Sequence, residues 1–306
     1  MSRKPVVVGV DTSPEAGWAA EVACDLAARA GADCRLVHGT REIADIPLAM
    51  PADVASAELT QHLTAAARAK VVDALGNRVP AHALERLEVR LGKSWVVLAE
   101  AVAEHRAWLL VLGGKHHTPP IRWLGASTVH HAVRTIDVPV LVTGASRHPV
   151  QRVLVALDLS SAADPTLDVA REFAGLFGAS VRALHVVEPL PLLDELPVQV
   201  RYQDYVRQSE ERFEEIVSAH AADGELERAV CAGIPSSVVA EVANEWNADL
   251  LVVGSHGKGW VDRMLIGSTT ERLINRLPAS MMVVPVPAPT ERSGRPGANP
   301  NDPGDA

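Results

Sequence analysis

The chain carries the same pattern of residues twice, about 145 positions apart. Asp11 and Asp158 each end an apolar run, and His38 and His185 each lie in the next apolar run; both pairs are separated by 147 positions. Further pairs are separated by 141 positions: Gly92 and Gly233, Glu100 and Glu241, and Gly113 and Gly254. Solenoid repeats are much shorter, so this pattern indicates a duplicated domain.

Within each half, short apolar runs alternate with longer amphipathic segments. The predicted order is strand, helix, strand, helix, strand, helix, strand, glycine-rich loop, helix and strand. In the first half the strands are predicted near residues 6–10, 34–38, 84–89, 108–112 and 138–142. Valine-rich strands that alternate with helices indicate a parallel sheet built by right-handed crossovers. The predicted fold class is α/β, with two tandem domains, each a five-stranded parallel sheet with helices on both faces.

The most specific motif is the glycine-rich loop of the second half, residues 254–268, which reads GSHGKGWVDRMLIGS. It directly follows the apolar run 250–253, as expected for a loop at the carboxyl end of a buried parallel strand. After Gly267 the sequence STTERLINRL starts a helix, with hydroxyl residues expected at its N-cap. The N–H groups at a helix start can hold phosphate, and Gly254 and Gly257 let the backbone approach it. The motif predicts a nucleotide site; the alternative is a structural turn with a helix cap.

This loop resembles the phosphate loop of the ATP-binding branch of the universal stress protein family. The resemblance rests on the spacing of the three glycines, on Lys258, on the serine and two threonines after the last glycine, and on Pro278 and the strand-like MMVVP that follow. It implies flavodoxin-like domains of the adenine nucleotide alpha hydrolase type, whose strand order reverses between the first and fourth strands. Ligands bind beyond the carboxyl ends of the strands at such a reversal. The end of strand one and the glycine-rich loop would therefore face one crevice.

The resemblance implies ATP as the ligand, held mainly by the second half. Asp158 would accept hydrogen bonds from ribose or adenine, and backbone near Val187 would meet the base. The residues expected around the phosphates are Gly254, Gly257, Gly267, Ser268, Thr269 and Thr270. Mg²⁺ is expected with the nucleotide, although no motif specifies its protein ligands. By propensity alone, Asp158 could equally be a turn residue or the cap of the helix near Thr166.

The first half departs from this pattern in its loop, which reads GGKHHTPPIRWLGAS. Aligned without a gap, it has His116 and Ala126 in place of the second and third glycines. Pro119 and Pro120 stiffen the loop and remove two N–H donors. The nucleotide-binding candidates that remain are Asp11, Gly113, Ser127 and Thr128. We therefore expect one nucleotide per chain, in the second half.

Composition disfavours several other classes of function. The formal net charge of −9 opposes binding to a nucleic-acid backbone, and the chain has neither a polybasic membrane patch nor an apolar run of spanning length. The N-terminus enters a strand without a signal-peptide core, so a cytoplasmic location is expected. Cys24, Cys34 and Cys231 lie in separate predicted elements without CxxC spacing and are predicted to be buried, reduced thiols.

No catalytic or metal-binding constellation is recognisable. The chain lacks a Walker A loop, the HxGH and SGGxDS motifs of adenylate chemistry, and a GxSxG elbow. The leading hypothesis is an ATP-binding stress-response regulator or sensor that acts on a regulatory protein partner of unknown identity. The alternatives are a slow ATPase or adenylate-handling enzyme, a protein-interaction scaffold with a vestigial site, and an FAD-binding protein of related fold.

The expected domains are residues 1–146 and 150–287, followed by a tail, 288–306, whose low apolar content predicts disorder. The last strand of each half, at 139–142 and 281–284, is apolar and lies at a sheet edge. In the family that the chain resembles, such strands commonly pair domains or subunits. We expect the two halves to pair within the chain as a pseudo-dimer, with a homodimer as a further possibility.

Overall fold

The fold was taken from a computed structural model, which describes residues 3–40, 57–114, 128–144, 150–189, 202–220, 226–255 and 266–285. The first half contains β1 (Arg3–Gly9), α1 (Pro14–Ala30), β2 (Ala32–Thr40), α2 (Ala57–Leu75), a 3₁₀ turn η3 (Gly76–Arg78), α3 (Ala81–Glu85), β3 (Glu88–Leu91), α4 (Ser94–His105), β4 (Leu109–Gly113), α5 (Thr128–Thr135) and β5 (Val140–Thr143). The second half contains β6 (Arg152–Leu157), α6 (Ala163–Phe177), β7 (Ser180–Val187), α7 (Tyr202–Ala219), β8 (Leu226–Ala232), α8 (Pro235–Glu245), β9 (Leu250–Gly254), α9 (Ser268–Arg276) and β10 (Ser280–Val284). The predicted tail, 288–306, lies outside the described residues.

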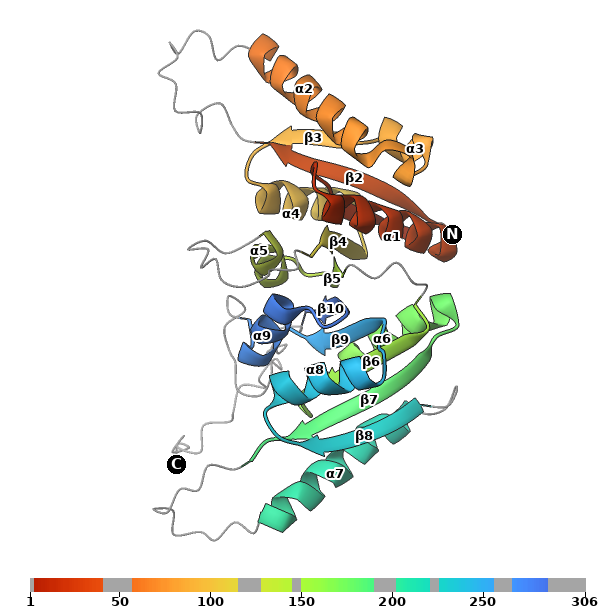
Figure 1. The fold of residues 1–306 in the computed structure, drawn as a ribbon, viewed down its shortest axis with the longest axis vertical. Helices are drawn as coiled ribbons and strands as arrows, with labels where there is room; N and C mark the ends of the chain where they lie inside the picture. The colour runs from red at the N-terminus through yellow and green to blue at the C-terminus, as the bar shows by residue number, and fades with distance from the viewer. Residues whose placement is uncertain are drawn as a thin grey trace, which may run out of the picture.

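All ten strands form one sheet, in the order β3-β2-β1-β4-β5-β10-β9-β6-β7-β8. Neighbouring strands are parallel everywhere except at the centre, where β5 and β10 pair antiparallel and join the two halves (Figure 1). In that register Met282 lies opposite Leu141, and Val283 lies opposite Val140. The predicted pairing of the two halves within one chain is therefore confirmed.

Each half has the strand order 3-2-1-4-5, so the order reverses between its first and fourth strands, as expected. This order differs from the 2-1-3-4-5 of flavodoxin itself but creates the same kind of crevice beyond the strand ends. The predicted strand positions are close to the observed ones, with the largest difference in the third strand. That strand begins at Glu88, because Leu84 and Glu85 belong to the short helix α3.

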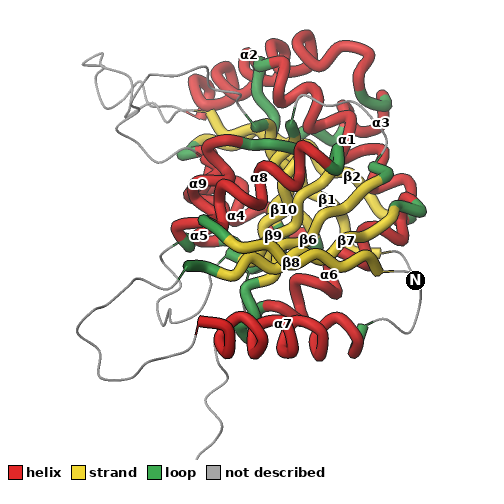
Figure 2. The backbone as a smooth tube through the Cα atoms, turned by 60° about the horizontal axis from the view of Figure 1, so that its bottom comes forward, coloured by secondary structure: helices red, strands yellow, loops and turns green. Residues whose placement is uncertain are grey.

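Helices cover both faces of the sheet (Figure 2). Each face has its own core of buried side chains. Along β1, Val6 and Val8 point to one face while Val7 points to the other, since side chains alternate along a strand. The first face is covered by α1, α2, α6 and α7, and the second by α4, α5, α8 and α9. Burial on both faces explains why the strands read as continuous apolar runs instead of alternating ones.

Among the described residues, no helix combines the length and the apolar sequence needed to cross a bilayer.

Candidate functional site

A cavity of about 290 Å³ lies at the strand-order reversal of the second half. It sits beyond the carboxyl ends of β6 and β9, beside the start of α9. Six of the residues predicted to bind nucleotide line it together: Asp158, Gly254, Gly267, Ser268, Thr269 and Thr270. The sequence motif and the topology therefore point to the same place.

Asp158 supplies one buried carboxylate oxygen that has no hydrogen-bond partner among the described residues. Its Oδ1 accepts hydrogen bonds from the backbone N–H of Ser160 at 3.1 Å and from the Ser160 hydroxyl at 2.7 Å. Its Oδ2 is buried, and within the part of the chain that the structure describes it receives no hydrogen bond. Most buried carboxylate oxygens in proteins are hydrogen-bonded. A buried oxygen without a partner, on a residue that lines a cavity, therefore suggests an acceptor for an N–H or O–H group of a ligand.

The backbone around Asp158 confirms one structural role for it and contradicts another. The two bonds to Ser160 form a local turn, in which Leu159 has a φ of 62°, a left-handed value that is unfavourable for leucine. The carboxylate does not cap the next helix, because α6 begins at Ala163 and its N-cap, Ala162, has no side-chain cap bond. Asp158 is thus a turn residue through one oxygen and a candidate ligand group through the other.

On another wall of the cavity, the start of α9 presents backbone N–H groups. Gly267, and not a hydroxyl residue as predicted, is the N-cap, with φ −58° and ψ 141° and no side-chain cap. The N–H groups of Ser268, Thr269 and Thr270 in the first turn have no carbonyl partner within the helix. Their partial positive charge favours an anion.

Hydrogen bonds tie this helix start to the strand ends. The Thr270 hydroxyl donates to the carbonyl of Gly254 at 2.8 Å, so it holds the helix to β9. The N–H of Gly267 donates to the carbonyl of Ser255 at 3.0 Å, and the N–H of Ser255 donates to Val284 in β10 at 2.8 Å. The α9 start is therefore connected through Ser255 to β10, the strand that joins the two halves.

Two other predictions for this site have different outcomes. Val187 is buried and does not line the cavity, although its neighbours Val186 and Glu188 do. Its carbonyl accepts the N–H of Gly233 at 3.0 Å. Gly257 and Lys258 lie outside the described residues.

His185 is a cavity residue for which the sequence suggested no role. Its Nδ1 lies 2.8 Å from the carbonyl of Leu157, the last residue of β6, so the ring donates through this nitrogen and bridges β7 to β6. His38 makes the equivalent contact with the Val10 carbonyl at 2.7 Å. The 147-residue offset between these histidines was the only sequence signal, and it matches the offset between the two carbonyls.

The first half has its own cavity, about 570 Å³, at the equivalent reversal. Of the predicted residues, Asp11, Gly113 and Thr128 line it, while Ser127 lies outside the described residues. Asp11 is exposed, and its Oδ1 binds the backbone N–H of Ser13 at 2.8 Å as well as the Ser13 hydroxyl. It therefore lacks the buried, unpartnered oxygen of Asp158.

The larger cavity differs from the smaller one in its walls. It is lined in part by Ile274 and Asn275 from the end of α9 in the second half, and by the C-cap of that helix, Leu277. Burial is the main cause that lowers the pKa of His130, which also lines this cavity. The Glu271 carboxylate opposes this shift, while Arg134 and His131 add to it. The imidazole is therefore favoured in its neutral form, which offers no fixed positive charge for a phosphate.

Gly113 is explained by packing without any ligand. A Cβ at this position would lie 2.7 Å from the backbone carbon and oxygen of Glu15, at the start of α1. Real Cβ atoms do not approach backbone this closely, so the glycine lets β4 and α1 meet. The first matched glycine of the first half is consequently no evidence for phosphate binding there.

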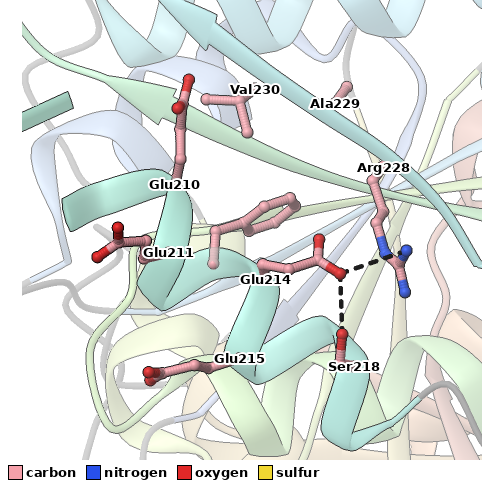
Figure 3. Close-up of a pocket in the computed structure, with 9 residues that line it drawn as sticks. Glu210, Glu211, Glu214, Glu215, Ser218, Arg228, Ala229 and Val230 are labelled. Carbon is pink, nitrogen blue, oxygen red and sulfur yellow. Dashed lines mark hydrogen bonds and ion pairs between the residues drawn. The ribbon is translucent and has the colours of Figure 1, made fainter. Parts of the chain in front are cut away.

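The largest of these hollows, about 800 Å³, lies elsewhere, between α7 and the edge strand β8 (Figure 3). Its lining includes Glu210, Glu211, Glu214 and Glu215, with Arg228 within 3.4 Å of Glu214. The excess of carboxylates opposes an anionic ligand. Despite its size, this hollow is therefore not the nucleotide candidate. The buried Oδ2 of Asp158 and the start of α9 favour the cavity of about 290 Å³ in the second half.

No group of three or more histidine, cysteine, aspartate or glutamate side chains is arranged to hold a metal ion in the ranges that the structure describes. His131 on α5 stacks on Trp95 with ring centroids 4.9 Å apart. It therefore has a packing contact.

Comparison with known proteins gives the same family for both halves. The protein-family model described as "Universal stress protein family" matches residues 2–144 and, a second time, residues 149–285. A universal stress protein of Mycolicibacterium smegmatis is 27% identical over 300 residues, covering 91% of this chain and 96% of that protein. Universal stress protein A homolog 1 of Coxiella burnetii is 28% identical over 139 residues, covering 44% of this chain and 95% of its own length. The crystal structure of a universal stress protein from Archaeoglobus fulgidus superposes with a TM-score of 0.62 at 20% identity, covering 92% and 97% of the two chains, which supports the fold.

Proposed function

Because the chain belongs to the universal stress protein family, as a tandem of two family domains, we propose that it is an ATP-binding stress-response regulator. We assign the nucleotide mainly to the C-terminal half, in the cavity between the ends of β6 and β9 and the start of α9.

The observation that carries this proposal is the buried, unpartnered Oδ2 of Asp158. An unpaired buried acceptor costs about 1–3 kcal/mol, which a ligand hydroxyl or amine recovers when it donates to that oxygen. The 2′- and 3′-hydroxyls of a ribose and the exocyclic amine of adenine are such donors. A nucleotide would thus satisfy an atom that the described residues leave without a partner.

The other end of the ligand is assigned to the α9 start. Three N–H groups in its first turn lack helical carbonyl partners, and they attract a phosphate without any charged side chain. An acceptor on one wall and donors on another match a molecule with hydroxyls at one end and an anion at the other. The described residues enclose about 290 Å³, at the lower end of the range for small-molecule sites, so we expect the phosphates to extend along the helix start.

Mg²⁺ fits this site only as a companion of the nucleotide. Asp158 and Glu188 are the carboxylates among the described lining residues, and they do not form a three-ligand cluster. Mg²⁺ is commonly held by one or two protein ligands together with phosphates and water. We therefore expect the nucleotide to bring most of the coordination.

We propose that ATP acts by stabilising one state of the chain. A ligand that binds only the folded site stabilises it by about 2.7 kcal/mol at a concentration 100 times its Kd. Because the α9 start is bonded through Ser255 to β10, ordering it would also stiffen the junction between the halves. A stiffened junction is a form that a regulatory protein partner, or a second copy of the chain, could recognise.

The test is nucleotide stoichiometry by native mass spectrometry, with ATP titrations followed by calorimetry. We expect one ATP per chain, and we expect Gly267→Val to abolish binding, since it places a branched side chain at the helix start. The dihedral angles of Gly267 are accessible to valine, so the fold should survive. Gly175→Val is the matched control, because the space around Gly175 on α6 is open.

The outcomes separate the alternatives. Retention of ATP without phosphate release supports the regulator. Sustained phosphate release that Gly267→Val abolishes would instead make the protein a slow ATPase. If neither cavity binds ATP, the nucleotide proposal fails and a scaffold acting through protein contacts remains.

A further inference from the structure

Two of the three cysteines meet in the N-terminal half. Cys24 lies on α1 and Cys34 on β2, and their sulfur atoms are 3.1 Å apart, both as free thiols. A disulfide bond is about 2.05 Å long, so the sulfurs need to approach by only about 1 Å. Both residues pack against the core of this half and both are half-buried, which leaves them within reach of a small oxidant.

The two thiols are chemically unequal. The two sulfur atoms share a hydrogen bond, and this bond lowers the pKa of Cys24 against the opposing effect of burial. The same bond raises the pKa of Cys34, together with burial and the nearby carboxylate of Asp33. The thiolate is the reactive form of cysteine, so Cys24 is the expected nucleophile and Cys34 the resolving thiol.

We propose that Cys24 and Cys34 are a redox modification site, at which hydrogen peroxide or an organic hydroperoxide converts the pair reversibly into a disulfide within the domain. This inference does not depend on ATP binding.

The chemistry proceeds in two balanced steps. The Cys24 thiolate attacks one peroxide oxygen, the O–O bond breaks, and hydroxide leaves and is protonated to water; Cys24 becomes a sulfenic acid. The Cys34 sulfur then attacks the Cys24 sulfur, the S–O bond breaks, and the Cys34 proton leaves with the hydroxide as a second water. Two thiols and one peroxide thus give one disulfide and two waters, and a dithiol reductant reverses the change by exchange.

The disulfide would join α1 to β2 around an 11-residue loop from Cys24 to Cys34. The other ends of these elements line the first cavity, through Ala16 on α1 and Val37, His38 and Gly39 on β2. Cross-linking therefore fixes two walls of that cavity relative to each other. For a loop of this length we expect the thermal midpoint of the N-terminal half to rise by roughly 6–11 °C.

Cys231 is the internal control. It is also half-buried, but it lies on β8, eight strand positions from β2 in the sheet, which is roughly 38 Å at about 4.8 Å per strand. It cannot reach either of the other cysteines within one chain.

The experiment uses the reduced full-length chain, exposed to one equivalent of hydrogen peroxide, then alkylated and weighed by intact-mass spectrometry. We expect a loss of 2 Da, with only one cysteine alkylated, and a Cys24–Cys34 cross-linked peptide after digestion. Cys34→Ser should instead leave a sulfenic acid on Cys24 that dimedone traps, and Cys231→Ser should behave as the wild type. Dithiothreitol should restore three alkylatable thiols.

A second measurement follows the rate at which iodoacetamide alkylates Cys24 at neutral pH. We expect Cys24 to react about 10-fold faster than Cys231, and Cys34→Ala to remove most of this advantage by removing the hydrogen bond. The proposal is overturned if peroxide yields only cross-links between chains, if no cross-link forms, or if dithiothreitol does not reverse it. Equal reactivity of Cys24 and Cys231 would overturn the assignment of Cys24 as the nucleophile.

Discussion

Replacing Asp158 by asparagine should weaken ATP binding while stabilising the ligand-free protein. The amide oxygen can keep the two hydrogen bonds from Ser160, so the local turn should survive. The buried, unpartnered oxygen becomes an NH₂ group, which cannot accept a hydrogen bond from a ribose hydroxyl. One substitution thus separates the structural role of this residue from its proposed ligand role.

The two effects differ in sign and can be estimated separately. Replacing this partly buried carboxylate, whose Oδ2 has no hydrogen-bond partner among the described residues, should stabilise the apo protein by about 1 kcal/mol, part of the gain being cancelled by the equally unpaired NH₂ group. That corresponds to roughly 2–4 °C in Tm for a domain of this size. Loss of a hydrogen bond to a charged acceptor should cost about 2 kcal/mol of binding, or about 30-fold in Kd.

The assay is thermal unfolding with and without Mg²⁺-ATP at one fixed concentration. At 100 times the wild-type Kd, ATP should stabilise the wild type by about 2.7 kcal/mol and Asp158→Asn by only about 0.9 kcal/mol. Asp11→Asn makes the same change at the exposed, equivalent position of the first half and should alter either value by less than about 0.5 kcal/mol. An undiminished ATP shift in Asp158→Asn, or an apo protein less stable than the wild type, would refute the reasoning.

Three further predictions concern stability. Gly113→Ala places a Cβ 2.7 Å from the Glu15 backbone and should cost about 1–3 kcal/mol in urea unfolding, whereas Gly175→Ala, on an open helix surface, should be neutral or stabilising. Val140→Asp buries an unpaired carboxylate beside Val283 at the junction of the halves. We expect the free energy of unfolding to fall by about 3–5 kcal/mol and a protease to cut early between the halves. Resistance to the protease equal to that of the wild type would contradict the role of this junction. Glu88 has a lowered pKa: burial raises it, but the hydrogen bond from Arg90 and the contact with His105 outweigh that effect. A lowered pKa in the folded state gives stability that is present above the ordinary value of 4.5 and is lost as pH falls below it. Glu88→Gln should therefore reduce the dependence of the free energy of unfolding on pH in this acidic range. An unchanged pH dependence would contradict a contribution from Glu88.

The cysteines show the limit of reading spacing alone. The sequence predicted three buried, reduced thiols in separate elements, and their placement in α1, β2 and β8 agrees with separate elements. All three are half-buried, however, and Cys24 meets Cys34. This pair is ten positions apart, across a helix end and a strand start, and no short motif encodes that approach. Only the packing of α1 on β2 brings the sulfurs together.

The candidate nucleotide site was likewise predicted only in part from the sequence. The glycine spacing, the preceding apolar run and the following helix located the loop, and the structure brings six predicted residues to one cavity. The sequence could not reveal that the Thr270 hydroxyl is engaged by the Gly254 carbonyl, or that His185 bridges two strands. Each of these contacts joins residues 16 or more positions apart.

By itself, the sequence determined the duplication, the order of strands and helices, and the α/β class. These properties are written in short-range patterns: apolar runs for strands buried on both faces, and helical spacing for segments buried on one. The tertiary structure decided which oxygen of Asp158 has no partner among the described residues and which two thiols touch. Such features depend on how distant segments approach one another, and a few tenths of an ångström in that packing separate a satisfied atom from an orphan.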